Sequence, residues 1–251
     1  MVESTKLRSP TKAMVLAAGL GLRMRPLTQN LPKPLLCVGG RTMLDQALDR
    51  LAEVGVKDVV VNAHWLPEKI KMHLCKRNEV NITILEEKEL LDTGGGVANA
   101  LSFLGDNPFY VLNGDVVWRD GARSALSRLT QMWCGEQMDA LLLLMPSVSS
   151  FGYEGIGDFI MNPLGQLRRR PECEVSPFVF TGVQLVHPRI FEDLPNKAFS
   201  MNLLYDRAIN SNRLFGIVHD GDWFHVGTPF ALEEADAEIE EREGARVRLL
   251  F

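Results

Sequence analysis

The feature that most constrains the fold is the alternation of short apolar runs with amphipathic segments between residues 13 and 146. The runs predict strands over 13–18, 58–62, 81–85, 109–112 and 140–145, and the segments between them predict helices over 42–54, 67–77, 97–104 and 122–133. Strands that alternate with helices through short connections are typical of a sheet covered on both faces. We therefore expect an α/β fold, a Rossmann-like three-layer sandwich with a mixed, mostly parallel sheet.

The pattern changes after residue 146, because strand-like segments follow one another there without helices between them. Strands are predicted over 157–161, 166–169 and 178–186, helices over 188–194 and 201–210, strands over 214–218 and 223–226, and a last helix over 229–243. The first three strands predict a small antiparallel insertion. We expect a disordered leader over 1–12, a single domain over 13–243 with halves 13–146 and 147–243, and a tail over 244–251.

A glycine turn followed by basic residues comes directly after the first apolar run. Gly19 and Gly21 permit a positive φ and let backbone N–H groups approach a ligand closely. No Asp or Glu occurs between residues 13 and 44, although the whole chain has a formal charge of −5. The cations of this stretch are Arg23, Arg25, Lys33 and Arg41. A turn of this kind with unpaired cations is expected to bind a polyphosphate.

Two better-known phosphate loops are excluded by the same residues. Met24 stands where the dinucleotide fingerprint has its third glycine, and the chain has no P-loop motif. Asp115 follows the predicted strand 109–112 and is expected to face the same crevice, because ligands bind at the carboxyl ends of such strands. A carboxylate beside a cationic phosphate pocket calls for a divalent cation between them.

Glycines mark two further segments. Asp92 to Gly96 contains three consecutive glycines before a helical pattern, which suggests a close approach of backbone to a ligand. Gly182 interrupts a strand rich in Val and Phe, which suggests the same. The run Arg168-Arg169-Arg170 is expected to be a solvated hairpin turn, and the acidic stretch from Glu233 to Glu241 a solvated helix face.

Composition excludes several classes of protein. A pI of about 5.6 gives no broad attraction to nucleic acid or to an anionic membrane. The four cysteines lie far apart with no C-x-x-C pair, which argues against a zinc or redox site and fits a reducing compartment. No run reaches the roughly 18 apolar residues of a membrane span. We expect a cytoplasmic protein without nucleic-acid or membrane partners, either a monomer or a small homo-oligomer.

The segment from Leu16 to Leu35 resembles the signature of the sugar-1-phosphate nucleotidyltransferases. It reads LAAGLGLRMRPLT, followed by PKPL. The resemblance extends to about Glu241 and is strongest to a bacterial subgroup, the N-acetylmuramate α-1-phosphate uridylyltransferases, with mannose-1-phosphate guanylyltransferases close by. It implies a transfer of a nucleotidyl group from an NTP to a sugar-1-phosphate with release of pyrophosphate, for cell-wall recycling or cell-surface polysaccharide synthesis.

The resemblance also implies roles for particular residues. Arg23 is expected at the β- and γ-phosphates, Lys33 at the α-phosphate or the sugar phosphate, and Asp115 at Mg²⁺, with Mn²⁺ as an alternative. The nucleotide-binding residues, in the half 13–146, are Leu16, Ala18, Gly19, Gly21, Gly94, Gly95 and Asn113. The sugar-phosphate-binding residues, in the half 147–243, are Gly157, Thr181 and Gly182.

One departure from the family pattern concerns the metal. The segment Trp223 to Pro229 resembles a family element whose third residue is a second metal-binding Asp, and this chain has His225 there. Imidazole is a poorer ligand for Mg²⁺ than a carboxylate. The resemblance implies that His225 binds either the metal or a phosphate, and the alternative is that it is a packed polar residue.

The expected substrates are UTP and N-acetylmuramate-1-phosphate. Two alternatives stay open on the sequence. One is a guanylyltransferase acting on mannose-1-phosphate, or a transferase for another sugar. The other is a nucleotide-sugar-binding protein without catalysis, whose metal site is incomplete because of His225.

Overall fold

The computed structural model describes residues 9–248, and side chains as far as residue 242. Within that range the α-helices are α1 (Met43–Glu53), α2 (Pro67–Leu74), α3 (Asp92–Leu104), α4 (Ala125–Met132), α5 (Met201–Asn210) and α6 (Pro229–Arg248). The longer strands are β1 (Lys12–Leu16), β4 (Asp58–Ala63), β5 (Asn81–Glu86), β6 (Phe109–Asn113), β8 (Ala140–Pro146), β11 (Phe178–Val186) and β12 (Leu214–Val218). The short strands are β2 (Cys37–Val38), β3 (Arg41–Thr42), β7 (Val117–Arg119), β9 (Phe159–Met161), β10 (Leu167–Arg169) and β13 (Asp222–Phe224).

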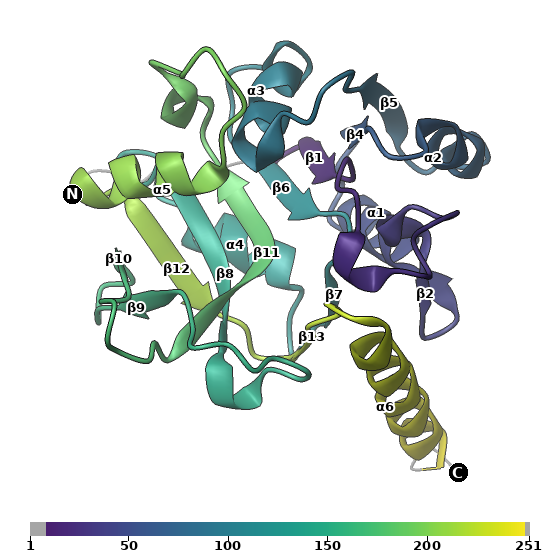
Figure 1. Cartoon of the computed structure of the whole chain (residues 1–251). Helices are drawn as coiled ribbons and strands as arrows, with labels where there is room; N and C mark the ends of the chain where they lie inside the picture. The colour runs from purple at the N-terminus through teal and green to yellow at the C-terminus, as the bar shows by residue number, and fades with distance from the viewer. Residues whose placement is uncertain (1–8, 249–251) are drawn as a thin grey trace.

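A mixed sheet of nine strands forms the centre of the described chain (Figure 1). Strands β5, β4, β1 and β6 lie side by side and run parallel. Strand β11 lies antiparallel between β6 and β8, and β12 runs parallel to β8. Strands β9 and β10 form an antiparallel hairpin beside β11. The α/β sandwich with a mixed sheet and a small antiparallel insertion is thus confirmed.

Each face of the sheet has its own apolar core, because successive strand residues point to opposite sides. In β1, Ala13 and Val15 pack with residues of α1, α2 and α4, whereas Met14 packs with residues of α3 and α5. The helices therefore form the two outer layers of the sandwich.

A third, smaller core lies under α6. It joins the hairpin of β2 and β3 and the two-stranded sheet of β7 and β13 to the inner face of α6 through Ala235 and Ile239. Glu233, Glu234, Glu240 and Glu241 are exposed on α6, as expected. Asp236 is different, because its carboxylate accepts a hydrogen bond of 2.6 Å from the Gly39 N–H and so ties the helix to the hairpin.

Several predicted boundaries are wrong. Helix α3 begins at Asp92, five residues before the predicted start, and strand β7 was not predicted. Lys12 belongs to β1 rather than to a leader, while residues 1–8 lie outside the described chain. Helix α6 runs to Arg248, past the predicted end at residue 243. Among the described residues, none of the helices has the length and apolar character needed to cross a membrane.

Candidate active site

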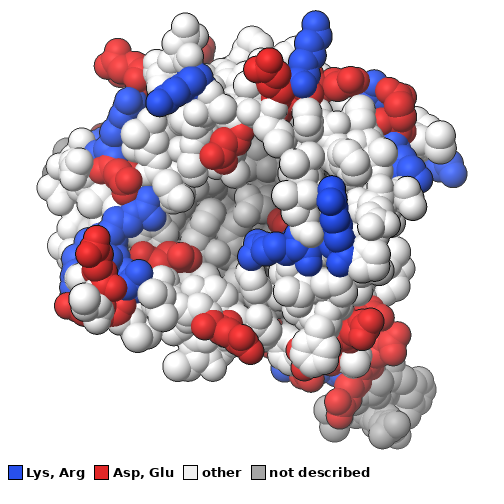
Figure 2. All heavy atoms as spheres, in the orientation of Figure 1, with Lys and Arg blue, Asp and Glu red and all other residues white. Residues whose placement is uncertain are grey.

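A pocket of about 740 Å³ opens at the carboxyl ends of the four parallel strands. Each of these strands contributes one lining residue near its carboxyl end, namely Leu16, Asn62, Glu87 and Asn113. The remainder of the lining comes from the loop after β1, Leu90 before α3, the start of α3, Lys33, Pro34, Asp115 and Gly227. Figure 2 shows the hollow in the middle of this face, with Lys and Arg side chains on its right-hand rim. The crevice thus lies where the sequence predicts it.

The glycine turn forms one wall of the pocket. Gly21 has a φ of 61°, and a Cβ there would lie 3.0 Å from the Thr28 side chain. The Thr28 hydroxyl donates a hydrogen bond of 2.7 Å to the Gly21 carbonyl, which fixes the turn. A Cβ on Gly19 would come within 4 Å of no other described residue beyond its chain neighbours, so the backbone there is open to a ligand. Leu16, Ala18, Gly19 and Gly21 all line the pocket, as predicted.

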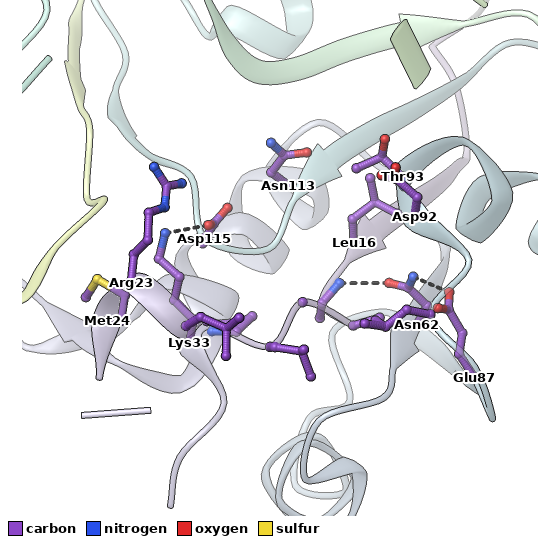
Figure 3. Close-up of a pocket in the computed structure, with 18 of the residues that line it drawn as sticks. Leu16, Arg23, Met24, Lys33, Asn62, Glu87, Asp92, Thr93, Asn113 and Asp115 are labelled. Atoms are coloured by element: carbon purple, nitrogen blue, oxygen red, sulfur yellow. Dashed lines mark hydrogen bonds and ion pairs between the residues drawn. The ribbon is translucent and has the colours of Figure 1, made fainter. Parts of the chain in front are cut away.

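Lys33 and Asp115 form an ion pair inside the pocket, with Nζ and Oδ2 2.6 Å apart (Figure 3). The two residues are brought together because Lys33 lies in the long loop after β1 and Asp115 lies two residues beyond β6, and these strands are neighbours in the sheet. Lys33 is held in a 3-10 turn (Lys33–Leu35) between Pro32 and Pro34, and its side chain is 14% exposed. The expectation of unpaired cations is therefore wrong for Lys33.

Arg23 stands beside this pair, and its exposed guanidinium forms no ion pair within the described residues. Arg41 lies elsewhere and pairs with Asp49 at 2.7 Å. Arg25 is exposed and does not line the pocket. The cationic end of the pocket is thus Arg23 together with the Lys33–Asp115 pair, which leaves one positive charge among these three residues for an anionic ligand.

The opposite end of the pocket is built on a buried carboxylate that the sequence reasoning missed. The Ala17 N–H donates to Asn62 Oδ1 at 2.7 Å, and Asn62 Nδ2 donates to Glu87 Oε1 at 2.6 Å (Figure 3). Glu87 also accepts a hydrogen bond from the Leu91 N–H, and only 5% of the residue is exposed. The position of Glu87 directly after β5 could have predicted it as a site residue. Asp115 was predicted by the same reasoning, from its position just after β6.

The three glycines that precede the predicted helix lie inside the first turns of α3. The Gly95 N–H donates to the Phe199 carbonyl at 3.0 Å, and a Cβ on Gly94 would lie 2.5 Å from the Phe199 ring. Neither residue lines the pocket, whereas Asp92 and Thr93 do. The close approach that these glycines permit is therefore to another part of the protein, not to a ligand.

The residues expected at the sugar phosphate do not line the pocket. Gly182 has a φ of 89° at a register shift in β11, and a Cβ there would lie 2.8 Å from the Asn113 side chain. Thr181 is buried, and its hydroxyl donates to the Leu143 carbonyl at 2.8 Å, so it does not offer this hydroxyl to a ligand. Gly157 is buried too, and its N–H donates to the Tyr153 hydroxyl at 3.0 Å.

His225 lies next to the cationic end of the pocket. Its ring meets the Tyr153 ring edge-on with centroids 5.6 Å apart, and Gly227, two residues on, lines the pocket. Burial and the charges of Lys33 and Arg23 lower the pKa of His225 below its usual value, so the imidazole is neutral near pH 7. Neutral imidazole is the form that binds metals.

The donors at the cationic end fit a substrate-bridged divalent cation. No group of three or more His, Cys, Asp or Glu side chains arranged for a metal occurs in the described part of the chain. Mg²⁺ is commonly held by one or two carboxylates together with substrate phosphates rather than by a complete protein cage. Asp115, whose side chain is 37% exposed, supplies such a carboxylate.

Comparison with known proteins identifies the class. A family model described as nucleotidyl transferase matches residues 12–242, so the chain belongs to the nucleotidyl transferase family and is an enzyme of that class. The predicted family is thus confirmed.

Particular relatives narrow the comparison further. The chain is 38% identical over 239 residues to the N-acetylmuramate alpha-1-phosphate uridylyltransferase of Caulobacter vibrioides, covering 93% of this chain and 99% of that protein. It is 35% identical to the protein of the same name from Neisseria meningitidis, covering 90% and 97%. The structure of UDP-glucose pyrophosphorylase complexed with UDP-glucose shares the fold, with a TM-score of 0.77 and 16% identity over 92% of this chain and 98% of that one.

Proposed function

We propose that the protein transfers a nucleotidyl group from UTP to N-acetylmuramate-1-phosphate and releases pyrophosphate. The observation that supports this most directly is the polarity of the pocket. Arg23, Lys33 and Asp115 stand at one end, Asn62 and Glu87 stand at the other, and the backbone of the glycine turn lies between them. A nucleoside triphosphate has the same polarity, with anionic phosphates at one end and a hydrogen-bonding base at the other.

The residues at the cationic end suit an in-line attack of the sugar phosphate on the α-phosphorus. Such a reaction requires positioning and stabilisation of charge rather than covalent help from the protein. Arg23 stabilises the charge that grows on the departing pyrophosphate, and Lys33 neutralises the α-phosphate or the incoming sugar phosphate. Asp115, with His225 as a second candidate ligand, would hold a Mg²⁺ ion, which supplies Lewis-acid stabilisation of phosphate oxygens when bound.

Glu87 offers hydrogen-bond acceptors to the base. An ionised carboxylate only accepts hydrogen bonds, and both Glu87 oxygens accept one already from donors inside the protein. Its remaining lone pairs favour a base with a ring N–H, such as uracil, thymine or guanine. Cytosine and adenine lack this ring N–H and would have to donate through their exocyclic amino groups instead. Among the favoured bases, uracil agrees with the names of the two bacterial relatives.

The test is a panel of the four NTPs against several sugar-1-phosphates, with pyrophosphate release as the readout. We expect UTP with N-acetylmuramate-1-phosphate to give the highest kcat/KM. A preference for GTP and mannose-1-phosphate by more than about 10-fold, equivalent to about 1.4 kcal/mol, would favour the guanylyltransferase alternative. Nucleotide binding without pyrophosphate release from any combination of NTP and sugar-1-phosphate would favour the non-catalytic alternative. The presence of Arg23, Lys33 and Asp115 argues against that alternative.

A further inference from the structure

Two ion pairs of the described chain have the same N–O distance but different surroundings. Arg169 and Asp206 lie 2.6 Å apart outside the pocket, with 35% and 54% of their side chains exposed. Arg169 lies on β10, so the solvated turn predicted for the three consecutive arginines is wrong at this position. Lys33 and Asp115 also lie 2.6 Å apart, but both line the pocket. This second pair therefore meets any ligand that enters the pocket.

The backbone holds Lys33 and Asp115 next to each other. The Gly114 N–H donates a hydrogen bond of 2.8 Å to the Leu16 carbonyl at the end of β1. A Cβ on Gly114 would lie 2.8 Å from that carbonyl oxygen and 3.4 Å from Pro34 Cγ. The chain neighbours of the two charged residues are thus packed together, and the ion pair can open only through movement of its side chains.

The Lys33 ammonium competes with a divalent cation for the Asp115 carboxylate. Within the described residues, Lys33 is the only ion-pair partner of this carboxylate. A divalent cation would be bound through the same carboxylate oxygens, and two cations held so close to each other repel strongly. The ion pair therefore opposes metal binding at Asp115.

The charges at this end of the pocket act in the same sense. Arg23, Lys33 and Asp115 stand together in Figure 3 and carry two positive charges and one negative charge. This excess disfavours a divalent cation that arrives alone. A nucleoside triphosphate reverses the sign, because its phosphates attract the Lys33 ammonium and also offer oxygen ligands to a metal.

We propose that Lys33 blocks the Asp115 carboxylate to divalent cations in the free protein and leaves it for the phosphates when a nucleotide binds. This inference rests on the proposed function, because it takes a triphosphate as the ligand of the cationic end. Lys33 thus has two partners in turn, Asp115 in the free protein and phosphate in the complex. It follows that metal and nucleotide bind together, and that each strengthens the binding of the other by the same factor.

The experiment measures Mn²⁺ binding to the protein without nucleotide, by electron paramagnetic resonance of the free ion. We expect Lys33→Gln to lower the Kd for Mn²⁺ by about 10- to 100-fold, because it removes a competing charge-assisted hydrogen bond. Lys33→Arg should stay close to wild type, since it keeps a cation beside the carboxylate. The double variant Lys33→Gln/Asp115→Asn should lose the gain, because the carboxylate that binds the metal is gone.

Arg169→Gln is the matched control. It removes the same charge and frees the Asp206 carboxylate from an ion pair of the same length, but outside the pocket. Its Kd for Mn²⁺ should stay within about 2-fold of wild type, because exposed charges interact weakly with distant sites.

Turnover gives a second readout on the same proteins. Lys33→Gln should bind Mn²⁺ more tightly and yet release pyrophosphate more slowly, because Lys33 is also needed at the phosphates. A general disturbance of the pocket would weaken both properties, and a Tm for each variant would detect it.

Three outcomes overturn the inference. They are an equal Kd for Mn²⁺ in wild type and Lys33→Gln, an equal gain in Arg169→Gln, and a gain that survives Asp115→Asn. The proposed function fails separately, if wild type releases no pyrophosphate from any combination of NTP and sugar-1-phosphate. In that case the Mn²⁺ titrations still decide whether Lys33 and a metal compete for Asp115.

Discussion

Replacement of Gly96 by alanine tests the construction of the base end of the pocket. A Cβ on Gly96 would lie 2.7 Å from Asn62 Nδ2 and 3.0 Å from Glu87 Oε1, so the hydrogen bond between these two side chains must lengthen or break. A hydrogen bond to a charged group contributes about 1.5 to 3 kcal/mol. Replacement of glycine by alanine in a helix interior stabilises the helix by about 1 kcal/mol, which offsets part of this loss. The net loss is about 0.5 to 2 kcal/mol, which lowers the Tm of a chain of this size by about 1 to 8 °C.

Gly95→Ala is the matched control, because it offers the same gain in helix propensity in the next position. Its Cβ would meet Leu91 Cβ at 3.0 Å, and the next nearest atoms are backbone atoms of Phe199 and Ala198 at 3.8 and 3.9 Å. Thermal unfolding of both variants should give the lower Tm for Gly96→Ala. If Glu87 accepts a hydrogen bond from the base, kcat/KM for UTP should also fall by about 10-fold in Gly96→Ala, which corresponds to a loss of about 1.4 kcal/mol of transition-state stabilisation. A Gly96→Ala protein that melts at or above both wild type and Gly95→Ala would refute this account.

Three further predictions concern the charged groups. Arg23→Ala and Lys33→Ala should each lower kcat/KM by at least about 100-fold, since each removes charge stabilisation worth roughly 3 kcal/mol. The circular dichroism spectrum of both variants should stay unchanged. Near-normal turnover in both would remove the basic loop from the mechanism. If His225 binds the metal, His225→Asp should lower the Mg²⁺ concentration for half-maximal rate and His225→Ala should raise it, and equal Mg²⁺ titrations in all three proteins would leave Asp115 as the protein ligand. Burial lowers the pKa of His219. Its Nε2 contacts the Arg119 and Asp222 carbonyls, and its buried Nδ1 has no hydrogen-bond partner among the described residues. The unfolded chain therefore binds the proton more readily, so stability falls as the pH drops below the ordinary value of about 6.5. Tm measured between pH 7.5 and 5.5 should decline less in His219→Gln, and parallel declines would contradict this reasoning.

The sequence predicted the sheet and its helices well because buried strands and amphipathic helices carry strong periodic signals. Helix α5 and strand β12 match their predicted ranges. The start of α3 was missed for a physical reason, since three glycines have poor helix propensity and packing against Phe199 overrides it. Tertiary contacts of this kind leave no periodic trace in the chain.

The site was predictable to the extent that it follows strand ends. Arg23, Lys33 and Asp115 were placed together because they follow strands that end at one edge of the sheet. That Lys33 pairs with Asp115, and that the Thr181 hydroxyl turns toward Leu143, depends on side-chain direction. The register shift in β11 changes that direction locally, and a shift of one residue is enough to turn a side chain to the other face.

The position of β11 has a consequence for how the molecule unfolds. This strand belongs to the second half of the chain, yet it fills the place between β6 and β8 of the first half. Without it, both of those strands would expose an unpaired edge in the middle of the sheet. Residues 13–146 are therefore expected not to fold as a separate fragment, and the chain should unfold in one cooperative transition. Hydrogen exchange would show this directly, because the slowest amides of β6, β8 and β11 should then exchange with the same opening free energy.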